Sequence, residues 1–68
     1  MTEEISRDKI QHLLGHWIEH NQSHNESFEQ WAERLKEADF SEVADAILEA
    51  SEKMEECTSL LEKARDLL

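Results

Sequence analysis

Residues 12–35, HLLGHWIEHNQSHNESFEQWAERL, contain two patterns that decide how this chain folds. The first is a stripe of large apolar residues at steps of three and four, running through Trp17, Phe28 and Leu35. Such a stripe predicts a helix with one buried side. The second pattern is a gap in this stripe, because no large apolar residue occurs between Ile18 and Phe28.

The two sides of the gap remain in phase. Steps of three and four that continue from Trp17 pass through His20 or Asn21, then His24, and arrive at Phe28. This agreement predicts one continuous helix over about residues 4–38. The alternative is a break inside the gap, because Ser23 followed by Glu26 matches a capping box, and a break there would give three helices.

A second helix is expected over about residues 41–67, after a turn at 38–41. Asp39 with Glu42 three residues later resembles a capping box at its start. A near-heptad stripe follows, made of Phe40, Val43, Ile47, Met54, Leu61 and Leu68. The chain has no proline and one glycine, a composition that favours helix throughout.

The sequence therefore predicts an all-α fold: one domain, residues 1–68, with two long helices in an antiparallel hairpin. If the turn lies near Asp39, residues whose numbers add up to about 78 lie at the same level. A single hairpin leaves Trp17 and Trp31 half exposed, at about 1.5–3 kcal/mol for each large apolar side chain. We expect two hairpins to pair as a homodimeric four-helix bundle.

All four histidines of the chain recur at every fourth position: His12, His16, His20 and His24. Residues four apart on a helix can bind one metal ion from a single face. With Trp17 and Leu35 as the centre of the buried stripe, His24 is expected inside it and His20 at its edge.

These positions predict a site for a divalent transition metal such as nickel, cobalt or zinc, for which imidazole is a suitable ligand. The expected ligands are His16, His20 and His24, supplemented by Cys57 from the second helix. Three alternatives remain open from the residues alone. His24 and Asn21 can form a polar core layer that fixes the pairing of an adaptor or dimerisation module, two histidines can hold a haem, and Cys57 can be a small buried residue.

Composition excludes several other classes of function. Seventeen acidic residues against seven basic ones give a net charge of −10, which repels nucleic acid and attracts cations. In a zinc-hydrolase motif a glutamate directly follows the first histidine, but Trp17 follows His16 and Asn21 follows His20. The sequence also shows no set of residues typical of a catalytic site. We therefore expect no enzyme. No stretch is long and apolar enough for a membrane span, and a lone cysteine without a signal peptide predicts a cytoplasmic protein.

The block His16, Trp17, Ile18, Glu19, His20, Asn21 and His24, followed by Phe28, Trp31 and Ala32, resembles a family. It is similar to a small uncharacterised family of bacterial and archaeal helical domains. In that family a His-Trp-Ile-Glu-His-Asn-x-x-His block precedes a Phe-x-x-Trp-Ala block, sometimes behind a histidine-rich leader. The resemblance covers most of the chain and implies a helical domain without an established activity. A histidine-rich leader would imply transition-metal handling, and this chain has none.

Overall fold

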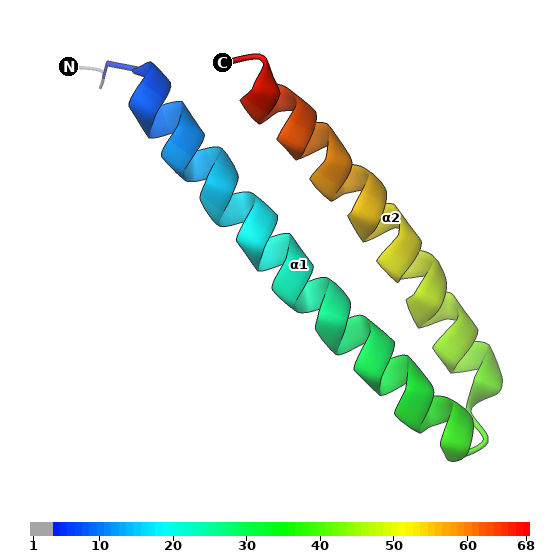
Figure 1. Cartoon of the computed structure of the whole chain (residues 1–68). Coiled ribbons are helices and arrows are strands. Elements are labelled where there is room, and N and C mark those ends of the chain that lie inside the picture. Colours follow the sequence, from blue (N-terminus) through cyan, green and yellow to red (C-terminus); the bar gives the residue numbers. More distant parts are fainter. Residues whose placement is uncertain (1–3) are drawn as a thin grey trace.

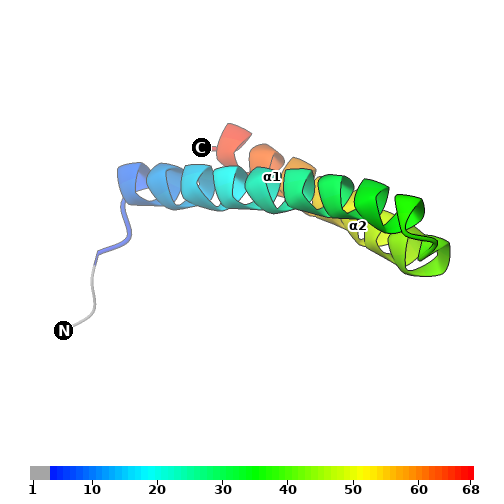
Figure 2. The same cartoon turned by 90° about the horizontal axis from the view of Figure 1, so that it is seen from below.

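The computed structural model describes residues 4–68, which form two helices in an antiparallel hairpin (Figure 1). Helix α1 spans Arg7–Glu37 and α2 spans Ser41–Asp66. Figure 2 shows the same pair from below, with α2 alongside α1. The hairpin is 53 Å long. Neither helix of the described chain is long and apolar enough to cross a membrane.

Helix α1 is continuous through the gap in the apolar stripe, as its phase predicts, and no break occurs near Asn21. It begins at the N-cap Ser6, whose side chain accepts a hydrogen bond from the backbone N–H of Lys9 at 3.2 Å. Asp8 in the first turn interacts favourably with the positive end of the helix dipole. Because α1 is unbroken from Arg7 to Glu37, the three-helix alternative is wrong.

The turn is a Schellman motif. Asp39 has a left-handed backbone, with φ 68°. The N–H of Phe40 donates to the carbonyl of Leu35 at 2.8 Å, and the N–H of Asp39 donates to that of Lys36 at 3.2 Å. The predicted capping box is wrong, because the N-cap of α2 is Phe40 and makes no side-chain capping bond. Asp39 ends the first helix instead of starting the second.

Asp39→Gly is expected to stabilise the protein by about 0.5–1 kcal/mol. A left-handed conformation costs an L-residue about 1–2 kcal/mol, and glycine avoids most of that cost while adding some entropy to the unfolded chain. Urea denaturation at one fixed protein concentration measures the change. Asp39→Ala is the control and should destabilise. A midpoint for the glycine variant at or below that of the wild type would contradict the assignment.

The two helices meet through small and medium-sized residues. Those buried in the hairpin are Leu14, Ile18 and Ala32 on α1, with Ala44, Ser51 and Thr58 on α2. Ala32 and Ala44 are 1% and 0% exposed, and their small side chains let the backbones approach closely near the turn. The residues of α2 repeat every seven positions, as in antiparallel coiled-coil packing.

The predicted centre of the buried stripe is therefore wrong. Trp17 is 44% exposed and Trp31 is 54% exposed, whereas Ile18 is 4% exposed. On a helical wheel the contact side of α1 is rotated by about 75° from the direction of Trp17. The rotation also leaves His24 exposed. Placing the largest apolar residues toward α2 predicted the wrong side of α1, because small side chains occupy the closest contact between the two helices.

Asparagines explain why the apolar stripe is interrupted. The amide oxygen of Asn25 accepts a hydrogen bond at 2.6 Å from the hydroxyl of Ser51, which is 4% exposed. The amide of Asn25 also donates to Glu55 at 3.4 Å, and that of Asn21 donates to the sulfur of Cys57 at 3.7 Å. A polar layer thus crosses the middle of the hairpin, made by asparagines and not by histidines. Buried polar pairs of this kind fix the register of paired helices.

One side of the hairpin carries most of the large apolar residues. On a helical wheel of each helix, angles are measured from the direction that faces the other helix. Because the two helices are antiparallel, residues at about 40–160° in the same rotational sense lie on one side of the hairpin. We call this side the apolar face. Its large or apolar members are Ile10, Leu13, Trp17, His20, His24, Phe28, Trp31 and Leu35 on α1, Val43, Ile47, Ala50, Met54, Cys57, Leu61 and Ala64 on α2, and Leu68 after its end. None of them carries a carboxylate, while Arg65 shares the wheel angle of Ile47 and the guanidinium of Arg34 lies 5.0 Å from the ring centroid of Trp31.

Candidate metal centre

The histidines follow one another along the exposed surface of α1. The Nε2 atoms of His20 and His24 lie 3.0 Å apart, and their ring centroids are separated by 4.4 Å. The ring of His16 is stacked at 6.2 Å from that of His20, and the ring of Phe28 lies 6.3 Å from that of His24. Of the predicted ligands, the structure brings His20 and His24 together most closely.

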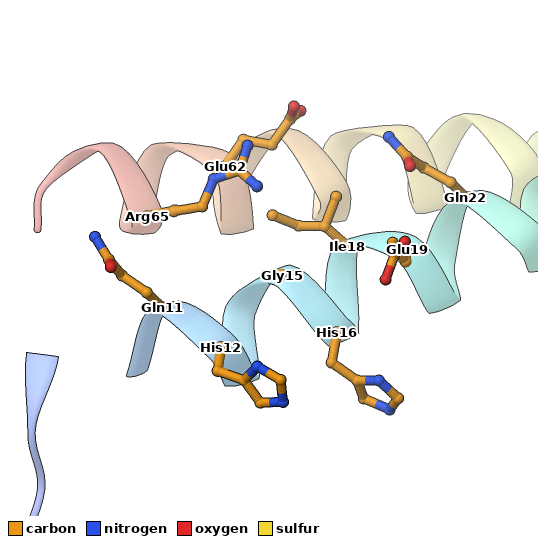
Figure 3. Close-up of a pocket in the computed structure, with 9 residues that line it drawn as sticks. All are labelled: Gln11, His12, Gly15, His16, Ile18, Glu19, Gln22, Glu62 and Arg65. Atoms are coloured by element: carbon orange, nitrogen blue, oxygen red, sulfur yellow. The ribbon is translucent and has the colours of Figure 1, made fainter. Parts of the chain in front are cut away.

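His12 and His16 lie at the other end of the row. Both side chains point away from α2, whereas Ile18 points toward it (Figure 3). They lie beside an open surface hollow whose other lining residues include Gln11, Glu62 and Arg65. This hollow is on the opposite side from the apolar face, and it contains amide and charged groups without a pairing of acid, base and nucleophile. His16 is therefore a peripheral member of the candidate site.

Cys57 is exposed, so the alternative that it is a small buried residue is wrong for this hairpin. Its sulfur contacts the amide of Asn21 at 3.7 Å. It lies on α2 at about the level of His20, as the expected register requires. Within residues 4–68 no group of three or more His, Cys, Asp or Glu side chains is placed to hold a metal ion.

The pair His20 and His24 can do two things chemically. One ring can donate an N–H to the other nitrogen, if their tautomers differ. Alternatively, both lone pairs can bind one cation. With metal–nitrogen distances of about 2.0–2.1 Å, nitrogens 3.0 Å apart subtend an angle of about 95° at the metal. This is close to the right angle between neighbouring ligands in square-planar or octahedral sites, which suit nickel and copper.

The surroundings of the pair are favourable for a cation. The chain carries a net charge of −10, which raises the local concentration of cations around it. No acidic side chain forms an ion pair with either histidine in the described chain, where the salt bridges are Lys36–Asp45 and Lys53–Glu56. Both imidazoles are therefore free to act as ligands.

Sequence reasoning missed two features of this region. The first is Asn25, whose bond to Ser51 holds α1 against α2 directly behind the histidine pair. Its position in the apolar gap, in phase with Ile18, was the available signal. The second is that the face shared by the histidine pair with Trp17 and Trp31 is exposed, which follows only once the contact side of α1 is known.

Comparisons with known proteins show the family to which the chain belongs. A family model described as a domain of unknown function, DUF8180, matches residues 10–68. An uncharacterised protein of the archaeon Archaeoglobus fulgidus is 41% identical over 61 residues, which cover 90% of this chain and 97% of that protein. No solved structure matches the chain. The matched region includes both helices almost entirely, and this chain therefore belongs to the DUF8180 family.

Proposed function

We propose that this protein is a non-enzymatic homodimer that binds a divalent transition metal ion through His20 and His24. Two hairpins pack through their apolar faces as a four-helix bundle. The exposure of Trp31, at 54%, and of Val43, at 50%, supports this pairing, because contiguous exposed apolar surface marks a protein-binding site. The lack of carboxylates on this face supports it further, because most of the surface of the chain is acidic.

The observation that carries the metal-binding role is the 3.0 Å separation of the two Nε2 atoms. It places two imidazole nitrogens close enough together to bind one ion, at the middle of the apolar face. Burial between two hairpins would remove water from this point and strengthen the interaction of the ion with its ligands. Storage, delivery or sensing of nickel, cobalt or zinc fits such a site, because no neighbouring acid or base is placed for catalysis.

A second candidate function is a pairing or adaptor module without a metal. The Asn25–Ser51 bond favours it, because polar pairs inside helical bundles specify which helices associate and in which register. In that case the two histidines share a proton and add a polar layer between the hairpins.

Isothermal titration of the tag-free protein with Ni²⁺, Co²⁺ and Zn²⁺ separates the two candidates. The wild type is expected to bind at least one of these ions, and the double variant His20→Ala/His24→Ala is expected to lose at least 100-fold in affinity, since both ligands are removed. His12→Ala is the matched control, because its ring points away from α2 at the other end of the row. Absence of binding by the wild type would leave the pairing module as the function.

A further inference from the structure

On the apolar face of α1, the types of residue are arranged symmetrically about His24. Chemically similar residues stand at equal distances on either side of it. The matched pairs are Leu13 with Leu35, Trp17 with Trp31, and the aromatic rings His20 with Phe28. The residue numbers of each pair add up to 48, twice that of His24. His24 is therefore the centre of this surface.

Helix α2 has one such pair about Met54. Ile47 and Leu61 lie at equal distances from it, whereas Val43 is matched with the basic Arg65. The two centres lie at the same level of the hairpin. The hydrogen bonds of Asn21 with Cys57 and of Asn25 with Ser51 and Glu55 join residues whose numbers add up to between 76 and 80, which places His24 beside residues 52–56.

Because His24 of α1 and Met54 of α2 lie at the same level, one two-fold axis can pass through both, and the apolar face can pair with the same face of a second copy. Rotation by half a turn about an axis perpendicular to the helices, lying between the two faces, places each residue opposite the one equally far from the centre. We infer that two hairpins associate about this axis, with α1 antiparallel on α1 of the partner subunit and α2 on its α2. Trp17 then packs on Trp31 of the partner subunit, and Leu13 on its Leu35.

Charge also selects this face and a second copy as its occupant. Each chain carries a net charge of −10, so two copies repel one another over most of their surfaces. No carboxylate of α1 falls in the strip from Ile10 to Leu35 that forms the apolar face. Only an approach of face to face brings large apolar residues together without opposing carboxylates.

The axis also completes the metal centre. This step rests on the proposed metal-binding function. His24 lies on the axis, so the His24 rings of both subunits meet there, each with its own His20 ring at 3.0 Å between Nε2 atoms. Within residues 4–68 one chain groups fewer than three ligands of this kind, and the second chain supplies the missing ones. The site therefore takes one transition metal ion for two chains.

Pulsed electron-spin distance measurements test the axis without any metal. Spin labels are attached at Ser23→Cys or Arg34→Cys in the Cys57→Ser background, at exposed positions of α1 outside the apolar face. The two labels of a dimer should be offset along the helices by about 3 Å at position 23 and by about 30 Å at position 34, from a rise of 1.5 Å per residue. The measured distance should therefore be much longer at position 34.

Equal distances at the two positions would overturn the inferred axis, because an axis parallel to the helices keeps both pairs of labels level. A longer distance at position 23 than at position 34 would overturn it as well. The same result is required from the dimer with and without metal, so the outcome does not depend on whether an ion binds.

The stoichiometry of Ni²⁺ or Co²⁺ titration tests the shared site. One ion for two chains is expected. One ion for each chain would overturn the shared site, while leaving the metal-binding function of the His20–His24 pair in place. Absence of binding, together with the expected label distances, would overturn both the shared site and the proposed function and leave the axis standing.

Discussion

Trp31→Glu is expected to convert the proposed dimer into monomers at micromolar concentrations. The substitution removes a half-exposed tryptophan from the apolar face of each chain and places two carboxylates in an interface that otherwise has none. Partial burial of a large apolar side chain is worth about 1.5 kcal/mol, so two copies contribute about 3 kcal/mol, or about a 100-fold weaker dimer, before any cost of the carboxylates. Sedimentation equilibrium measures this change directly.

The matched control is Leu60→Glu. Leu60 is 65% exposed and thus comparable to Trp31, which is 54% exposed. On the helical wheel, however, Leu60 points away from both α1 and the apolar face. Its replacement should leave the dissociation constant of the dimer within about twofold, since surface substitutions usually change free energies by less than 0.5 kcal/mol. Equal weakening by Leu60→Glu and Trp31→Glu, or no weakening by either, would show that the apolar face is not the contact.

Metal ions are expected to raise the free energy of unfolding by about 2.7 kcal/mol when present at 100 times their dissociation constant. An ion that binds the folded dimer and not the unfolded chain stabilises the fold by mass action. Thermal unfolding at one fixed protein concentration, with and without Ni²⁺, measures the effect as a rise in Tm. Acidification should abolish the rise, because protonated imidazole does not bind metal.

Two variants make this result specific. His20→Ala/His24→Ala should show no rise in Tm with metal, whereas His12→Ala should show the full rise. A rise that persists in the double variant would place the bound ion elsewhere, on the acidic surface. A rise that is lost in His12→Ala would extend the site along the histidine row toward the open hollow.

The general fold was predictable from the sequence, while the rotation of each helix was not. The phase that connects Trp17 to Phe28 across the gap predicted one continuous helix, and the position of the turn predicted the level of Cys57 opposite Asn21. The large apolar residues suggested that Trp17 and Leu35 face α2. In the structure that position is taken by Ile18 and Ala32, because two backbones approach most closely where side chains are small.

The candidate site was predictable as a row but not as a pair on a surface. Spacing alone gave each histidine a neighbour one turn away, and only coordinates distinguish the 3.0 Å contact of His20 and His24 from the stacking of His16 at 6.2 Å between centroids. Of the two asparagines that bond across the hairpin, Asn21 was expected in a polar layer with His24, whereas Asn25 was not. A polar residue in the phase of the contact side carries little signal until its partner, here Ser51, is known.

The start of α1 and the C-terminal residue lie close together, because Arg7 donates a hydrogen bond to the carbonyl of Leu68 at the end of the hairpin opposite the turn (Figure 1). In the inferred dimer this end of one subunit lies beside the turn of the other. The two paired ends of the inferred dimer therefore lie about the length of one hairpin apart, 53 Å, and the proposed metal site lies between them.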